Sequence, residues 1–524
     1  MQGNGALMCY NGEEPAEGGW KMAGKRCIIS VLPARRRLFF AGVVAAVILS
    51  VLLFAPHPSA AVPRQTDSRL AEAGKDLTDY TVTLRLNDQE DTLAISEIIQ
   101  YRNDTGGTLS TLMVRTWLNA FQTEETSPAA LEELYDACYP DGFSPGVLEL
   151  FDVLWNGERA AYAYVNEDQT ALEIQIPALM DGQQGELTLR CVARVPACAY
   201  RAGKVGRDYQ LGNVLPLLSL YQDGEWRTDA YCPVGDPFLS ECAHFHVTLH
   251  LPEGYTPACS APLQKGEDGA WRGDLIAARD FCLCVSPDYA TASGRAGETV
   301  VYSHAKTEQG ARLALEYAKK ALETYAGLYG DYPWPTLTVC EVSFPFSGME
   351  YPGLCMIGAD NYREDRADTL ELTVAHEIAH QWFYALVGSD QALQPWQDEA
   401  LCEYAMLRYV RARYGQGSFE TLKYYRVDAP MREKLPGTLT PGSPIDYFGS
   451  LEDYRTVVYG RGAALLLALD ELLPGGADGF LKAYAEEFAF RFATRADFES
   501  CLNRYAKMDL DPLLADYLDT VMDD

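Results

Sequence analysis

Residues 373–382 read TVAHEIAHQW, and this segment restricts the fold and chemistry of the chain more than any other. Its apolar residues follow helical spacing, and residues four apart lie on one face of a helix. His376 and His380 can therefore bind one metal ion together, while Glu377 can act on water at that ion. The alternative is a chance match on a buried amphipathic helix, which is disfavoured because the chain has only seven histidines.

A metal site that activates water needs a third protein ligand, and Glu399 is the candidate. It lies 19 positions after His380, early in a helix predicted at residues 395–414. Two antiparallel helices joined by a short loop would place Glu399 against the histidines. The alternative is an acidic residue that only favours the helix dipole. Glu403, one turn later, is predicted either to accept the second ring N–H of a ligand histidine or to be a solvated charge.

The remainder of residues 296–524 follows a mixed pattern of strands and helices. A long amphipathic helix is predicted at residues 308–329, and the helix with the two histidines at residues 368–387. Buried strands are predicted at 336–343 and 354–357. Further helices are predicted at 419–426, 454–473, 479–490, 495–506 with Thr494 as N-cap, and 512–522.

Residues 80–284 alternate between apolar and polar side chains, as strands do, and turn sequences separate the runs. This pattern predicts a β-rich, sandwich-like domain over residues 78–290, after a polar linker at 62–77. A short helical insertion is expected near residues 128–137. Residues 286–297, rich in Ser, Pro, Gly and Ala, predict a domain boundary. One predicted strand carries Cys242, His244, His246 and His250 at even spacings, and we interpret these as ordinary strand side chains rather than metal ligands.

Two further stretches complete a known pattern. They are Ser347-Gly-Met-Glu-Tyr351 and Tyr459-Gly-Arg-Gly462. Together with His-Glu-x-x-His, eighteen residues and Glu399, they resemble the aminopeptidase N-like zinc peptidases, which are relatives of leukotriene hydrolase. The resemblance covers residues 80–524. It implies an α+β multidomain fold with a thermolysin-like catalytic domain at residues 296–524 and one Zn²⁺ per chain.

The resemblance also implies a role for each residue of these motifs. Zinc would be held by the two histidines and Glu399, and would acidify a bound water. Glu377 would be the general base, and Tyr459 would stabilise the oxyanion, with Tyr454 its nearest competitor. Substrate binding would use Glu350 for the free α-amine, with Gly348 and Met349 beside it.

Four positions depart from the family pattern. Ser347 and Tyr351 stand where the family has glycine and asparagine, which leaves Glu350 in place but changes the backbone contacts expected with substrate. Arg461 replaces lysine and keeps its charge, and Asp398 replaces the asparagine before the third ligand. We do not identify the second amine-binding residue that the family takes from its β domain. The chain ends soon after the catalytic domain, so we expect a more open and less strictly exopeptidic site.

The amino-terminal segment predicts export. Three arginines at 35–37 precede an uncharged run at residues 38–55, which is followed by prolines and Ser59-Ala60-Ala61. We interpret residues 35–61 as a cleaved signal or as a membrane anchor with residues 1–34 as a flexible cytoplasmic tail. Both versions place the rest of the chain outside the cytoplasm. There the 12 cysteines that follow the uncharged run, of 14 in the chain, can form disulfides, whose pairing the sequence does not reveal.

The net charge of −31 argues against binding of nucleic acid. The amino-terminal segment and the family resemblance together imply a membrane-anchored or secreted zinc aminopeptidase that acts on peptides with free N-termini. Two alternatives remain open at this stage. One is an endopeptidase with the same zinc site, and the other is a non-catalytic scaffold that retains the fold.

Overall fold

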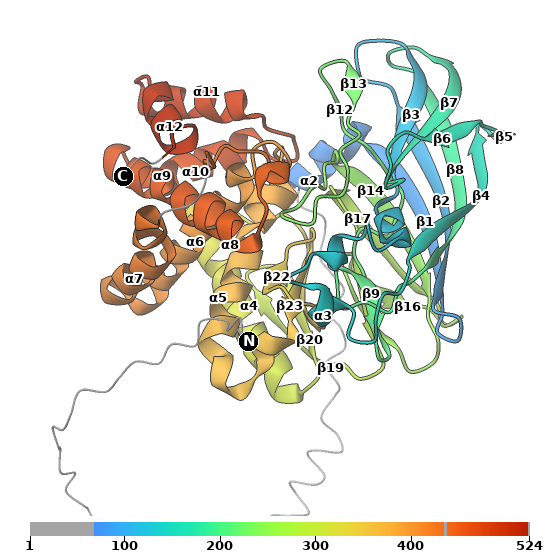
Figure 1. The fold of residues 1–524 in the computed structure, drawn as a ribbon, viewed down its shortest axis with the longest axis horizontal. Coiled ribbons are helices and arrows are strands. Elements are labelled where there is room, and N and C mark those ends of the chain that lie inside the picture. Colours follow the sequence, from blue (N-terminus) through green and yellow to red (C-terminus); the bar gives the residue numbers. More distant parts are fainter. Residues whose placement is uncertain (1–67, 434–437, 522–524) are drawn as a thin grey trace, which may run out of the picture. The chain divides into compact units, whose positions relative to one another are not determined.

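The computed structural model describes residues 68–433 and 438–521 (Figure 1). The tail and the signal or anchor predicted at residues 1–61 lie outside these residues. Within the described residues, no helix combines the length and the apolar character that crossing a membrane requires.

An eight-stranded sheet dominates the β-rich part. Along its strands, alternate side chains are buried, as in β1, where Val82 and Leu84 are buried and Arg85 is exposed. Neighbouring strands are antiparallel except for β1 and β14, which are parallel. In spatial order the strands are β16 (Gln264–Lys265), β17 (Trp271–Ala278), β14 (Ala243–His250), β1 (Thr78–Asn87), β2 (Thr92–Arg102), β8 (Gln184–Arg194), β4 (Val147–Trp155) and β5 (Glu158–Arg159).

Smaller sheets accompany this large sheet, which agrees with the predicted sheet-rich N-terminal part. One contains β15 (Thr256–Cys259), β18 (Leu283–Ser286), β10 (Asp208–Leu211) and β9 (Ala202–Val205). Another contains β11 (Leu217–Leu218), β3 (Leu109–Arg115), β7 (Ala171–Leu179) and β6 (Tyr162–Tyr164), and a hairpin joins β12 (Tyr221–Gln222) to β13 (Glu225–Trp226). The predicted helical insertion is a 3₁₀ turn at Pro128–Ala130 and the short helix α3 at Tyr135–Cys138.

Two segments predicted as linkers contain regular structure. The helix α2 (Ser68–Ala73) and a 3₁₀ turn lie within the expected linker 62–77. Leu70 of this helix is buried in the core, which an exposed linker residue would not be. Strand β19 (Ala290–Ala296) lies within the expected boundary 286–297, so the second domain's sheet begins six residues before the predicted position 296. The small residues of β19 give it the composition of a loop. It is nevertheless a strand at the edge of the sheet, because its backbone forms hydrogen bonds with β20.

The second part is built on a five-stranded sheet in the order β19, β20 (Thr299–Ala305), β21 (Thr336–Val342), β23 (Leu354–Gly358) and β22 (Gly348–Met349). The three central strands are parallel, and every residue of β21 is buried. Helix α4 (Glu308–Tyr329) has the predicted range. It packs against β19 and β20 and is capped by Thr307. The short edge strand β22 runs antiparallel to β23 and carries Gly348 and Met349 of the predicted substrate motif, with Glu350 directly after it.

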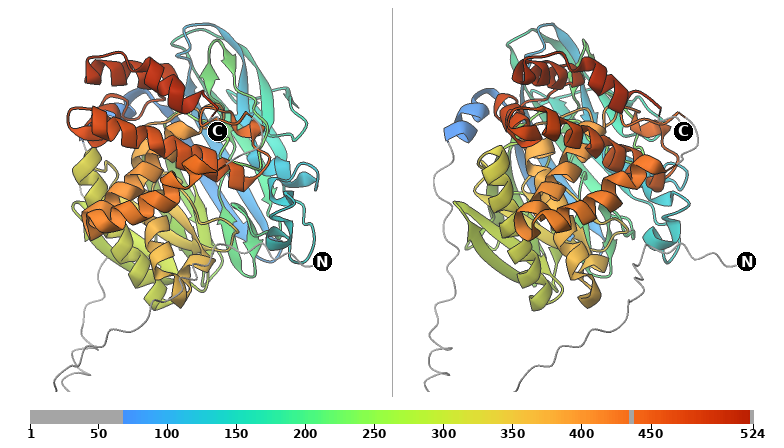
Figure 2. Two further views of the ribbon diagram at one scale, coloured as in Figure 1. Left: turned by 60° about the vertical axis from the view of Figure 1, so that its left-hand side comes forward. Right: turned by 90° about the vertical axis from the view of Figure 1, so that its left-hand side faces the viewer.

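Helices form the rest of the second part (Figure 2). They are α5 (Ala367–Ala379), α6 (Trp396–Tyr414), α7 (Gln416–Lys423), α8 (Leu451–Tyr454), α9 (Gly462–Leu472), α10 (Gly476–Glu487), α11 (Arg495–Ala506) and α12 (Asp511–Leu518). The predicted N-cap is confirmed, since Thr494 and Asp497 form a capping box. The single helices predicted at 368–387 and 454–473 are interrupted, because π-helical segments occupy Gln381–Leu386 and Arg455–Arg461.

Candidate active site

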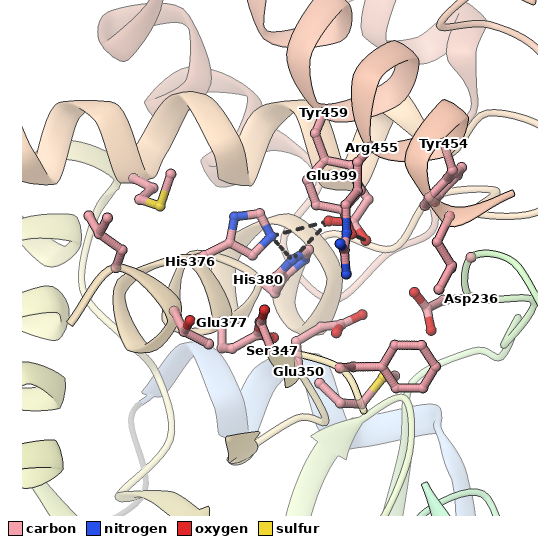
Figure 3. A pocket seen from close by; sticks show the side chains of 18 of the residues that line it. Asp236, Ser347, Glu350, His376, Glu377, His380, Glu399, Tyr454, Arg455 and Tyr459 are labelled. Carbon is pink, nitrogen blue, oxygen red and sulfur yellow. Dashed lines mark hydrogen bonds and ion pairs between the residues drawn. The ribbon is translucent and has the colours of Figure 1, made fainter. Parts of the chain in front are cut away.

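His376 of α5, His380 at the C-cap of that helix and Glu399 of α6 converge on one point (Figure 3). The Nε2 atoms of His376 and His380 lie 3.1 Å apart. The Oε2 atom of Glu399 lies 3.2 Å from Nε2 of His376 and 3.4 Å from Nε2 of His380. Tetrahedral zinc with ligand bonds of about 2.0–2.1 Å holds neighbouring ligand atoms about 3.3 Å apart. The three separations therefore fit a zinc ion bound between them.

The ligand arrangement follows from two packed helices. Helix α5 ends at Ala379, and a π-helical segment and a short loop return the chain so that α6 packs against α5. Glu399 lies in the first turn of α6 and is buried. Burial opposes ionisation, but hydrogen bonds from His376 and His380 outweigh it and hold the pKa of Glu399 below its ordinary value. The carboxylate is therefore in the charged form that binds a cation.

The second ring nitrogens of the histidines meet different carboxylates. Nδ1 of His380 lies 2.5 Å from Oδ1 of Asp398. This contact holds the imidazole with Nε2 turned toward the metal position. Nδ1 of His376 lies 3.6 Å from Glu403, which is too long for the predicted hydrogen bond. Glu403 instead accepts two hydrogen bonds from Arg426, at 2.6 and 2.7 Å. Sequence reasoning noted Asp398 only as a departure from the family and missed Arg426, which reaches Glu403 from 23 residues away.

Glu377 is buried beside the two histidines. Burial raises the pKa of its carboxyl to about 7, against the opposing effect of the histidine charges. Strand β22 lies directly over it, since a Cβ atom at Gly348 would come within 2.1 Å of Oε1 of Glu377. Glycine at position 348 is therefore needed for Glu377 to keep this position.

Glu350 follows strand β22 and is also buried. Its Oε1 atom has no hydrogen-bond partner within the described part of the chain. Burial raises the pKa of Glu350 well above its ordinary value. Figure 3 shows Glu350 between Glu377 and Asp236, with its side chain in the cavity. A buried carboxylate without a partner is costly, so this position favours a cationic ligand group.

Tyr459, and not Tyr454, contacts the metal-ligand cluster. Its hydroxyl donates a hydrogen bond to Oε1 of Glu399, and its ring stacks on His376 with 5.6 Å between ring centroids. Burial raises the pKa of Tyr459 well above its ordinary value, so the hydroxyl keeps its proton. Tyr454 lies one turn earlier and lines the same cavity, with 5.7 Å between the two tyrosine rings.

The cavity has a volume of about 250 Å³, and residues of the β-rich part close one end of it. There Arg201 and Asp236 form a buried ion pair of 2.6 Å. Burial raises the pKa of Asp236 to about 6, although Arg201 opposes the shift. Sequence reasoning missed both residues, because Gly235-Asp236-Pro237 has the composition of an ordinary turn and nothing links it in sequence to the metal ligands.

The four departures from the family pattern lie in different places. Asp398 contacts His380 as described, and Ser347 lines the cavity beside Gly348 and Met349. Tyr351 points elsewhere, since its hydroxyl donates to Asn213 at 2.6 Å. Arg461 is buried outside the cavity and donates to the backbone carbonyls of Pro430 and Glu433. Its charge therefore does not face the metal site.

The histidine-rich strand β14 contributes to no candidate metal cluster among the described residues. His246 lies between Asp79 and Asp274, at 3.2 and 2.7 Å, on the partly exposed face of β14. The strand predicted for these histidines is present as β14. The twelve cysteines of the described residues are free, and all but Cys232 are buried.

Comparison with known proteins points to one family. Residues 313–517 match the model of the peptidase family M1 domain. Leukotriene A-4 hydrolase of Xenopus laevis is 30% identical over 228 residues, which are 41% of this chain and 35% of that protein. Aminopeptidase B of Homo sapiens is 30% identical over 193 residues, which are 34% of this chain and 28% of that protein. The chain thus spans about a third of the length of these relatives.

The fold extends the likeness beyond the matched segment. The structure of an M1 zinc metallopeptidase from Deinococcus radiodurans superposes with a TM-score of 0.58 and 17% sequence identity. The match covers 86% of this chain and 96% of that one. The β-rich part and the helical part therefore share the fold of that protein.

Proposed function

We propose that this chain, which carries a peptidase family M1 domain at residues 313–517, is a zinc-dependent aminopeptidase. The ligand atoms of His376, His380 and Glu399 are separated by 3.1–3.4 Å, which supports zinc as the cofactor. When bound, zinc supplies a Lewis acid that polarises the peptide carbonyl and acidifies the attacking water.

The surrounding residues supply the proton transfers and the charge stabilisation. Glu377 takes a proton from the attacking water and delivers it to the leaving amine. Burial raises the pKa of this carboxyl above its ordinary value, which favours its accepting the proton of the attacking water. Tyr459 keeps its hydroxyl proton and donates it in a hydrogen bond to the carbonyl oxygen as negative charge develops.

The buried and unpaired carboxyl of Glu350 is the observation that carries the exopeptidase assignment. A substrate's α-ammonium group would satisfy Oε1 and return the carboxyl to its charged form. An internal peptide segment offers only a neutral amide N–H at that position, which does not compensate the negative charge of a buried Glu350. Free N-termini are therefore preferred by this site.

Hydrolysis of matched peptides tests the proposal. We expect zinc-loaded protein to cleave Leu-Gly-Gly and to lose at least about a hundredfold in kcat/KM when the amine is acetylated, because Glu350 then meets no cation. Equal rates on the two peptides would point to an endopeptidase. A Glu377→Gln variant should bind zinc and lose hydrolysis, and retained hydrolysis would reject Glu377 as the base.

We further propose that residues 38–55, with the arginines before them, direct the chain to the membrane or through it. The uncharged run and its basic flank support this proposal. Expression of the full chain followed by membrane fractionation and N-terminal sequencing tests it. Protein in the soluble cytoplasmic fraction with its first residues intact would contradict it.

A further inference from the structure

Arg455 is a cavity residue whose charge no described residue neutralises. It begins the π-helical segment Arg455–Arg461, lines the cavity and stays exposed. Across residues 68–433 and 438–521 it has neither a hydrogen bond nor an ion pair. The other arginines of the cavity differ, since Arg201 is paired with Asp236 and Arg426 with Glu403.

The two glutamates of the cavity indicate which part of a substrate meets Arg455. If Glu350 holds the α-ammonium group and Glu377 serves the leaving amine, the first residue of the substrate lies on the Glu350 side. Figure 3 shows Arg455 entering the cavity from the segment that carries Tyr459, on the side facing Glu350 and Asp236. Arg455 is therefore beside the first side chain of the substrate rather than beside the leaving group.

At this end of the cavity, Arg455 is the charged group that remains available to the side chain of the substrate's first residue. Asp236 is 2.6 Å from Arg201, so that pair is neutral as a whole. The negative charge of Glu350 would be matched by the α-ammonium group. An unpaired guanidinium at this position binds a carboxylate with charge-assisted hydrogen bonds, often two at once.

We infer that Arg455 determines specificity by binding the side-chain carboxylate of an N-terminal glutamate or aspartate. This inference rests on the proposed aminopeptidase function, because it uses the orientation that Glu350 gives the substrate. It assigns peptides with acidic N-terminal residues as the substrate class. Substrates with a basic first residue would place a cation against Arg455 and are disfavoured.

Glutamate and glutamine substrates have nearly the same size, so comparing them isolates the effect of the side-chain charge. The full-length, zinc-loaded protein is assayed on the p-nitroanilides of glutamate, glutamine, lysine and leucine. We expect kcat/KM for the glutamate substrate to exceed that for glutamine by at least about tenfold, as a hydrogen-bonded charge allows. In Arg455→Gln this ratio falls toward one, and in Arg455→Glu the lysine substrate becomes better than the glutamate substrate.

A matched control makes the same charge change elsewhere. Arg312 on α4 is exposed and pairs with the exposed Glu308, so Arg312→Gln should leave the glutamate-to-glutamine ratio unchanged. Wild-type protein that prefers glutamine to glutamate would overturn the inference. A preference for lysine that Arg455→Gln does not alter would also overturn it and would assign the side-chain site to Asp236. Failure to hydrolyse any of the four anilides with zinc bound would instead reject the proposed function, so the two failures are distinguishable.

Discussion

The close approach of strand β22 to helix α5 makes Gly348→Ala a sharp test of how the site is assembled. The added Cβ atom would lie 2.1 Å from Oε1 of Glu377, whereas such contacts are essentially never shorter than 3.0 Å. Glu377 or the strand must therefore move by about 0.9 Å or more. Misplacing a catalytic group by about 1 Å costs on the order of a hundredfold in rate. This factor corresponds to about 2.7 kcal/mol of lost transition-state stabilisation.

The assay compares kcat/KM on a fluorogenic aminoacyl amide, together with zinc content and thermal unfolding, for wild type and Gly348→Ala. We expect about a hundredfold loss of kcat/KM, because the base is displaced, with zinc still bound by the two histidines and Glu399. Gly417→Ala is the matched control, since no atom lies within 4 Å of a Cβ at that position in α7. Activity within threefold of wild type in Gly348→Ala would refute the placement of Glu377 beside this glycine.

Two further predictions concern buried carboxyl groups. Asp398→Ala removes the hydrogen-bond acceptor that orients His380, so we expect zinc to bind about 10–100-fold more weakly, which competition with a chelating dye measures; unchanged affinity would contradict this role. Glu97 is buried without a hydrogen-bond partner among the described residues, and burial raises its pKa well above the ordinary value of 4.5. Because the unfolded chain releases this proton more readily, the group lowers stability as pH rises above about 4.5. Denaturation should show Glu97→Gln to be more stable than wild type at pH 8 and to lose that advantage near pH 4, while an advantage that does not depend on pH would reject the explanation.

The metal ligands and the main helices could be predicted from the sequence because their signals are local. His376, Glu377 and His380 lie at the C-terminal end of one helix, and the spacing to Glu399 is short enough for two packed helices to decide the geometry. Helix α4 and the N-cap at Thr494 could likewise be predicted from the sequence. Amphipathic periodicity and capping both depend on residues only a few positions apart in the chain.

The rest depends on contacts between distant segments. Arg201 and Asp236 come from the β-rich part, and only the tertiary fold brings them to the cavity. The bond between Arg426 and Glu403 links α6 to a π-helical segment that no sequence pattern marked. Strand β19 has the composition of a loop and is ordered by its neighbour, which local propensity does not reveal.

Anomalous scattering at the zinc edge, from crystals of the zinc-loaded protein, tests the central claim most directly. The account predicts one peak per chain within about 2.0–2.2 Å of Nε2 of His376, Nε2 of His380 and an oxygen of Glu399. A peak at the neighbouring group of His380, Asp398 and Cys402, or no peak in folded protein, would contradict it.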